Sequence, residues 1–157
     1  MNTKLKKNLT ILFWIILIVG FYAVNVVINQ TLMYFGEPLE GAIKWSEDIM
    51  ALQLTIIILR CLSLIGFFGG LIVFILFFIQ GIKEGILFPR KNIPLLFVCT
   101  TFSFVYFLST DNLHIVKAAE RYFTVTMDAL LVPSIILIFT FLYKAAVQIN
   151  EENRLTI

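Results

Sequence analysis

The stretch LTIIILRCLSLIGFFGGLIVFILFFI, residues 54–79, decides the fold class, because it holds a single charged residue, Arg60. An apolar run of about 18 residues or more is long enough to cross the ~30 Å hydrocarbon core of a bilayer as an α-helix. Three further runs have the same character, at residues 9–28, 93–110 and 125–147. The sequence therefore predicts an all-α membrane protein with four transmembrane helices.

The composition leaves no room for a separate soluble domain. The chain has 157 residues, of which 60% are hydrophobic and 14% are charged, whereas soluble domains are usually about half apolar and a quarter charged. Residues 1–157 are therefore expected to form a single integral membrane domain. The basic N-terminus resembles the start of a signal peptide. The first run is longer than a signal-peptide core, however, and no small-x-small cleavage site follows it, which favours a transmembrane helix.

Lysine and arginine residues are unevenly divided between the two ends of the predicted helices. Eight lie in the N-terminus, the loop between the second and third runs, and the tail, against three in the two opposite loops. Because positively charged loops stay in the cytoplasm, both termini are expected on the cytoplasmic side of a bacterial-type inner or plasma membrane. The eight are Lys4, Lys6, Lys7, Lys83, Arg90, Lys91, Lys144 and Arg154, and the three are Lys44, Lys117 and Arg121.

Both external loops carry apolar residues at roughly helical spacing. In residues 36–50, Leu39, Ile43 and Ile49 fall near one face of a helix, and residues 111–123 have a similar mixture. We expect short amphipathic segments that lie in the outer interface of the membrane. Two ordinary polar loops with scattered hydrophobic residues are the alternative.

Two ionisable residues lie inside the predicted spans, where such residues are costly and indicate either a functional site or a buried pair. Arg60 and Asp128 fall in the outer halves of the second and fourth runs, and Asn25 lies near the outer end of the first. We therefore expect an intramembrane polar cluster of Asn25, Arg60 and Asp128. The favoured interpretations are a clamp between helices and an Arg60 that extends outward to water, and a ligand or ion site is the third.

Gly66 and Gly70 form a small-residue motif at which a second helix can approach closely. Packing within one chain is the favoured use of this motif. A contact between copies in a homo-oligomer is the alternative.

The sequence has no catalytic, cofactor-binding or metal-ligating motif. The one histidine, His114, has no cysteine or acidic residue at the spacing of a metal site. Cys61 and Cys99 lie inside apolar runs, where cysteine acts as a small packing residue. A net charge of +2 is too small to indicate direct nucleic-acid binding. We expect a non-enzymatic protein without a cofactor.

The cytoplasmic segments are the most distinctive part of the sequence. GIKEGILFPRKN, residues 81–92, joins the second and third runs, and AVQINEENRLTI, residues 146–157, closes the chain. A solvated tail is the ordinary expectation. The apolar residues Leu155 and Ile157 at its end favour a short docking element instead.

In these segments the chain resembles the DUF2975 family of small bacterial four-helix membrane proteins. The resemblance covers nearly the whole chain in architecture, and its marks before the third run are Gly85, Phe88 and the pair Lys91 and Asn92. The marks in the tail are Glu151, Glu152, Asn153, Leu155, Thr156 and Ile157, and Arg154 departs from the acidic or polar residue that is usual at its position. Because family members are often encoded beside a helix-turn-helix regulator of the Cro/CI type, the resemblance implies a DNA-binding partner. It implies no catalytic residues, and Phe88, Asn92 and the tail become the expected docking positions.

The leading interpretation is a membrane sensor or anchor for a cytoplasmic helix-turn-helix regulator. The alternative is a small transporter or an immunity-type membrane protein that uses the outer polar cluster. An intramembrane enzyme ranks third.

Overall fold

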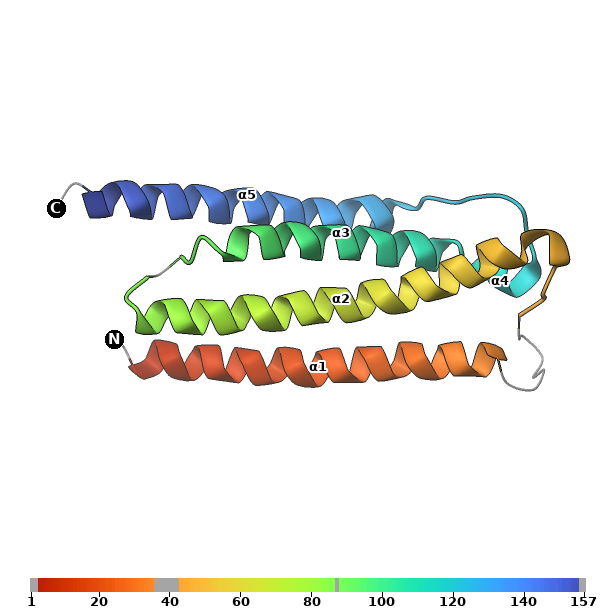
Figure 1. Cartoon of the computed structure of the whole chain (residues 1–157), viewed down its shortest axis with the longest axis horizontal. Helices are drawn as coiled ribbons and strands as arrows, with labels where there is room; N and C mark the ends of the chain where they lie inside the picture. The colour runs from red at the N-terminus through yellow and green to blue at the C-terminus, as the bar shows by residue number, and fades with distance from the viewer. Residues whose placement is uncertain (1–2, 36–42, 87, 156–157) are drawn as a thin grey trace.

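The computed structural model describes residues 3–35, 43–86 and 88–155, and every regular element among them is a helix. The four long helices lie alongside one another (Figure 1): α1 (Thr3–Phe35), α2 (Met50–Lys83), α3 (Asn92–Asp111) and α5 (Met127–Leu155). A 3-10 turn, η1 (Glu47–Ile49), leads into α2, and the short α4 (Leu113–Ala118) follows α3. Each long helix is long and apolar enough to cross a membrane, as the sequence predicts.

Three of the long helices extend well beyond the predicted apolar runs. α1 continues past residue 28 to Phe35, and α5 continues past residue 147 to Leu155. Hydropathy marks only the part of a helix that fits in the hydrocarbon core, whereas the helix itself ends where its backbone hydrogen bonds end. The predicted runs therefore mark the apolar part of each helix, and α1, α2 and α5 continue beyond it.

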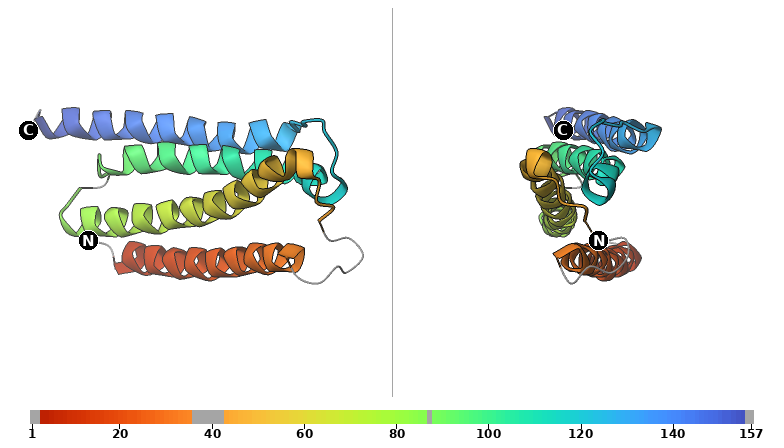
Figure 2. Two further views of the ribbon diagram at one scale, coloured as in Figure 1. Left: turned by 45° about the vertical axis from the view of Figure 1, so that its right-hand side comes forward. Right: turned by 90° about the vertical axis from the view of Figure 1, so that its right-hand side faces the viewer.

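The four helices form an open row rather than a closed bundle. α2 packs against α1 and α3, and α3 packs against α5. Among the described elements, the backbone of α5 does not come close to that of α1 or α2, although the ring of Phe74 on α2 reaches Tyr143 of α5. The end-on view in Figure 2 shows the row in the order α1, α2, α3, α5.

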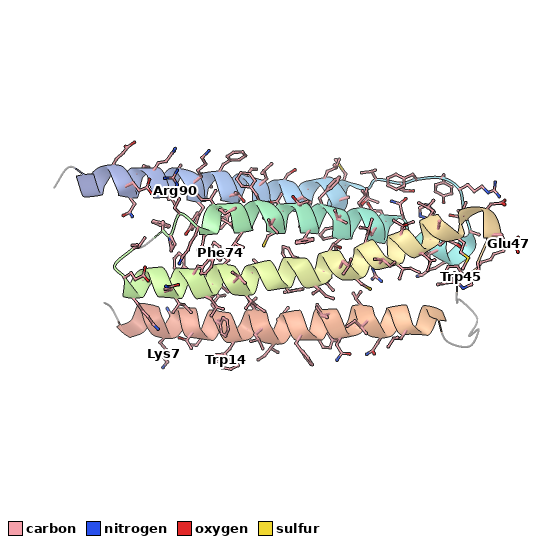
Figure 3. The ribbon with its side chains drawn as sticks, in the orientation of Figure 1. Lys7, Trp14, Trp45, Glu47, Phe74 and Arg90 are labelled. Carbon is pink, nitrogen blue, oxygen red and sulfur yellow. The ribbon has the colours of Figure 1, made fainter. Side chains whose placement is uncertain are left out.

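Most of the apolar surface of this row faces outward. In the most apolar window of each span, only 11% to 22% of the residues are buried within the protein. Large side chains such as Trp14, Phe21 and Ile138 are exposed, and Figure 3 shows Trp14 pointing away from the other helices. So large an exposed apolar surface is typical of a protein that contacts lipid, and the fold is consistent with a multi-pass membrane protein.

The row has two distinct ends. The first turn of α1 and the last turn of α5 lie at the same end, beside the connection between α2 and α3 (Figure 1). We call this the loop end, and we call the opposite end, with residues 43–49 and 112–126, the cap end. Four spans therefore return the chain to the side on which it starts.

The cap end is closed by a small apolar core and by buried side-chain amides. Ile56 and Ile57 of α2 pack against Ile115 and Val116 of α4. The amide of Gln53, which is fully buried, donates from Nε2 to two backbone carbonyl oxygens, those of Lys44 (2.9 Å) and Ile115 (3.0 Å).

Asn112 supports the segment that leads into α5. Its Nδ2 donates to the carbonyl oxygens of Leu108 and Thr124, and its Oδ1 accepts from the amide of Thr124, all at 2.8 Å. Arg121 also forms a salt bridge with Asp48 (2.8 Å), and both side chains are largely exposed, so this pair adds little stability. The two segments of the cap end are thus bound to each other and to α2.

The two segments that were predicted to be amphipathic have different structures. Residues 36–42 lie outside the described residues, 43–46 have no regular structure and 47–49 form η1. The second loop contains α4, whose apolar side is buried against α2 rather than exposed.

Candidate functional site

The connection between α2 and α3 folds back tightly on the end of α2. The amide of Ile86 donates to the carbonyl oxygen of Gly81 (2.7 Å), and Gly85 has a φ of 74°, a left-handed conformation that favours glycine. Pro89 then lies directly over Gly81, where a side chain on Gly81 would overlap the proline ring. The turn therefore carries Phe88 to Lys91 back toward the start of α3.

A polar junction fixes this connection to α5. Asn92 is fully buried at the start of α3, and its Nδ2 donates to the carbonyl oxygen of Phe74 and to the hydroxyl of Tyr143, both at 3.3 Å. The Tyr143 hydroxyl in turn donates to the carbonyl oxygen of Pro89 (3.2 Å). The junction therefore joins α2, the connection, α3 and α5 through two side chains.

Aromatic packing surrounds the junction. The rings of Phe74 and Phe88 both meet Tyr143 edge to face, each with 5.7 Å between ring centroids. Figure 3 shows Phe74 on the side of α2 that faces α3. Leu96 and Val147 complete this buried cluster, so the loop end has an apolar core of its own.

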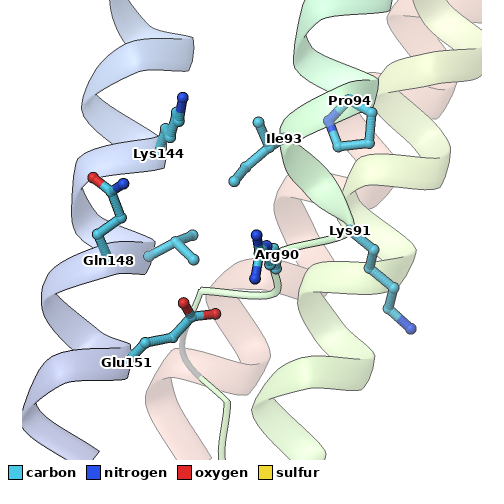
Figure 4. Close-up of a pocket in the computed structure, with 8 residues that line it drawn as sticks. Arg90, Lys91, Ile93, Pro94, Lys144, Gln148 and Glu151 are labelled. Atoms are coloured by element: carbon cyan, nitrogen blue, oxygen red, sulfur yellow. The ribbon is translucent and has the colours of Figure 1, made fainter.

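Two grooves flank the connection where it meets α5. The first, which we call the α5 groove, has a volume of about 590 Å³ and lies between α5 and the start of α3 (Figure 4). The second, the loop groove, has a volume of about 390 Å³ and lies between the turn after Gly81 and the end of α5, beside Asn150. Arg90, Lys91 and Glu151 line both grooves.

The predicted docking residues divide into buried and exposed sets. Asn92 is fully buried, so it supports the site and does not form its surface. Phe88 packs against Tyr143, but it is half-buried and also lines the loop groove. Glu151 and Glu152 are exposed on α5. Asn153 and Leu155 belong to the last turn of α5, and Thr156 and Ile157 lie outside the described residues.

The structure places the three residues of the predicted polar cluster on three different helices, α1, α2 and α5. Arg60 is buried, with its guanidinium carbon 6.0 Å from the ring centroid of Tyr106 on α3. Asp128 is exposed in the first turn of α5, where its charge suits the positive end of the helix dipole. Asn25 is exposed on α1 and accepts a hydrogen bond from Asn29 (2.8 Å). Arg60 is therefore buried on α2, whereas Asp128 is exposed on α5, and the backbones of these two helices are separated by α3.

The glycine motif is used within the chain, as predicted. A side-chain carbon on Gly66 would lie 2.5 Å from the ring of Phe102, and one on Gly70 would lie 2.6 Å from the sulfur of Cys99. Both neighbours belong to α3. These glycines therefore let α2 and α3 approach each other closely.

Two residues organise the fold in ways that the sequence did not predict, although Gln53 or Thr55 was expected to lie above the outer polar cluster. Tyr143 lies in an apolar run, where a tyrosine does not stand out from other aromatic residues. Gln53 precedes the predicted second run, and its full burial depends on contacts with residues 44 and 115, far along the chain. The side-chain types of Gln53 and Tyr143 were the available signal. An amide or a hydroxyl that becomes buried must find hydrogen-bond partners, so such a residue in or beside an apolar run is a candidate for linking segments of the chain.

The cap end offers a weaker candidate site. Both ring nitrogens of His114 lie 2.9 Å from backbone carbonyl oxygens, those of Asp111 and Tyr122, and its ring stacks on Tyr122. A hydrogen bond with Glu120 raises the pKa of the exposed Tyr122 hydroxyl above its usual value. These contacts order the loop, and in the described part of the chain no three His, Cys, Asp or Glu side chains could together hold a metal ion.

The loop end is thus the better candidate, because it combines two grooves, exposed charges of both signs and a rigid support. Its polar junction is assembled from four separate segments of the chain. Comparison with known proteins adds no relative, since no family model, no curated protein and no solved structure matches this chain.

Proposed function

We propose that this protein is a non-enzymatic membrane anchor that holds a cytoplasmic regulator, of the helix-turn-helix class, at its loop end. The observation that carries the proposal is the loop groove, which is formed jointly by the connection between α2 and α3 and by the end of α5. A surface built from two segments in this way presents the tail and the connection to one partner together. The class of partner rests on the resemblance to the DUF2975 family, and membership of that family stays a prediction.

The residues around the loop groove suit a protein partner. Glu84 and Glu151 are exposed near Arg90 and Lys91, so both signs of charge are available to steer and orient an approaching surface. Ile86 and the half-buried Phe88 add apolar area between these charges. The groove is small for a whole interface, and it therefore suits anchoring one side chain or a short segment of a partner.

A role in sensing would require communication between the two ends of the row. α2 carries Ile56 and Ile57 in the cap core and Phe74 in the core of the loop end. A shift of α2 at the cap would therefore act on a helix that also contacts the polar junction. A transport path through Asn25, Arg60 and Asp128 gains no support from burial, because Asn25 and Asp128 are exposed and only Arg60 is buried.

The proposal requires the loop end to face the cytoplasm, and cysteine labelling tests this. In a background of Cys61→Ala with Cys99→Ala, Lys44→Cys or Lys117→Cys is expected to react with a membrane-impermeant maleimide added to intact cells, because both positions are exposed at the cap end. Lys83→Cys, exposed at the loop end, is expected to react only after the membrane is opened. Labelling of Lys83→Cys in intact cells would reverse the orientation and end the proposal of a cytoplasmic partner.

The tail is expected to be needed for partner binding. Chemical cross-linking in native membranes, followed by purification, should recover a soluble helix-turn-helix protein with the full chain and lose it with a chain ending at Asn150. The shortened chain keeps Tyr143 and the junction, so its fold should survive. The recovered protein must then bind the purified full chain directly.

A matched charge variant separates docking from general charge loss. Glu84→Gln with Glu151→Gln removes two acidic side chains that line the loop groove, and it should weaken binding of the purified partner. Asp48→Gln with Glu120→Gln removes two at the cap end and should leave binding unchanged. The proposal would be refuted if the unchanged protein and both double variants bound the partner equally well. It would also be refuted if cross-linking recovered the same proteins with and without the tail.

A further inference from the structure

We infer that the α5 groove binds the headgroup of an anionic phospholipid, with the phosphate between Arg90 and Lys144. This site is separate in kind from the proposed partner surface, and its evidence does not depend on that partner. Three features of the groove support it: exposed basic side chains, the first turn of α3 and an apolar wall.

The charges in the groove are mainly positive and are available to a ligand. Arg90 and Lys144 are both exposed, and Figure 4 shows Arg90 between α5 and the start of α3. Within the described residues, neither side chain takes part in a hydrogen bond or ion pair, although Glu151 lines the same groove. Lys91 is different, because its Nζ donates to Gln80 (3.2 Å) and lies 4.4 Å from the ring centroid of Phe77.

The start of α3 adds a positive potential on the same side. Its first turn contains no acidic residue, and no side chain caps it. The amides of Asn92 and Ile93 already donate to the carbonyl oxygens of Pro89 and Arg90, and Pro94 has no N–H, so the attraction comes from the helix dipole, whose positive end favours a negatively charged group. Arg90 comes two residues before the first residue of α3, so the two attractions act on the same region of the groove.

The third feature distinguishes a lipid from a free anion. Ile93, Pro94 and Val147 also line the groove, and they belong to helices that are apolar enough to cross a membrane. A phosphate between Arg90 and Lys144 would therefore have an apolar wall next to it, on which the acyl chains of a lipid can pack. Basic pockets between transmembrane helices at the membrane surface are known to suit anionic headgroups, whereas free phosphate gains nothing from an apolar wall.

Native mass spectrometry of the purified full chain tests this inference. The probes are phosphatidylglycerol and phosphatidylcholine with the same acyl chains, added in increasing amounts to the protein in detergent. We expect phosphatidylglycerol to bind more tightly. Arg90→Gln with Lys144→Gln should weaken its binding about thirtyfold, because each basic residue near an anionic lipid contributes about a fivefold change. Binding of phosphatidylcholine should not change.

Three controls make the result specific. Lys83→Gln with Lys117→Gln removes the same charge from exposed positions outside the groove and should keep tight binding, and Arg90→Lys with Lys144→Arg should also keep it. An excess of inorganic phosphate should not displace the lipid. The inference fails if phosphatidylcholine binds equally well, if the two glutamine double variants lose the same affinity, or if inorganic phosphate displaces phosphatidylglycerol. Unchanged helical circular dichroism and melting in the glutamine variants would exclude unfolding as the cause of a loss.

Discussion

Replacing Gln53 with leucine is expected to lower the free energy of unfolding by about 2–4 kcal/mol. The Gln53 side chain is fully buried, and its Nε2 donates to the carbonyl oxygens of Lys44 and Ile115. Its Oε1 also accepts from the amide of Ser46 (3.3 Å). Leucine has a similar size but cannot form these bonds, so it would leave two carbonyls and one amide without their partner in a buried place.

Equilibrium unfolding in mixed micelles with a rising fraction of sodium dodecyl sulfate measures this loss. Hydrogen exchange at the Ser46 amide should also become faster, because that amide loses its acceptor. Thr55→Val is the matched control, since its exposed hydroxyl bonds only to the Ala51 carbonyl of its own helix, and a change within about 0.5 kcal/mol is expected. If the two variants are equally stable, Gln53 does not hold the cap.

The four spans could be predicted from the sequence because a membrane imposes a simple condition on it. Each span needs a long apolar run with few charges, and residues 9–28, 54–79, 93–110 and 125–147 meet that condition. The order of the helices in space is not subject to any such condition. Since lipid and protein interiors are almost equally apolar, hydropathy does not say which helix lies next to which.

This gap explains the outcome for the polar cluster. Arg60 and Asp128 were expected to pair because they lie at similar depths in the membrane. Similar depth is necessary for a pair, but their two helices must also be neighbours. In the structure α3 lies between them, and Arg60 lies near Tyr106 of α3 instead. The prediction from Gly66 and Gly70 did not need the order of the helices. Two glycines on one face of a helix allow any neighbouring helix to approach closely, and here that neighbour is α3.

Docking at the loop end stays a prediction, but the structure separates its residues by burial. Asn92 is buried against Tyr143 and supports the site, whereas Phe88 contacts Tyr143 and also lines the loop groove. Arg90 and Lys144, which line the α5 groove, had entered the sequence analysis only as charges that orient the chain. A charge count records how many basic residues lie on a side, and only the fold shows which of them share a groove.

Replacing Gly81 with alanine is expected to lower the free energy of unfolding by about 1–3 kcal/mol. The new methyl group would overlap the ring of Pro89 and would lie 2.8 Å from the backbone oxygen of Ile86. Neither neighbour can rotate away as the end of a flexible side chain can, so the connection itself must move. Because the Pro89 carbonyl accepts the hydrogen bond from Tyr143, that movement would also strain the polar junction and distort both grooves.

Gly69→Ala provides the matched control for Gly81→Ala, because both glycines lie in α2 and both changes add one methyl group. No atom lies within 4 Å of the position that a side-chain carbon on Gly69 would take. Alanine is the better helix former by about 0.5–1 kcal/mol, so Gly69→Ala should stabilise the protein slightly. The two substitutions should therefore shift the unfolding midpoint in detergent in opposite directions. Equal shifts would mean that the connection does not press on Gly81, and that the junction with α5 does not depend on this turn.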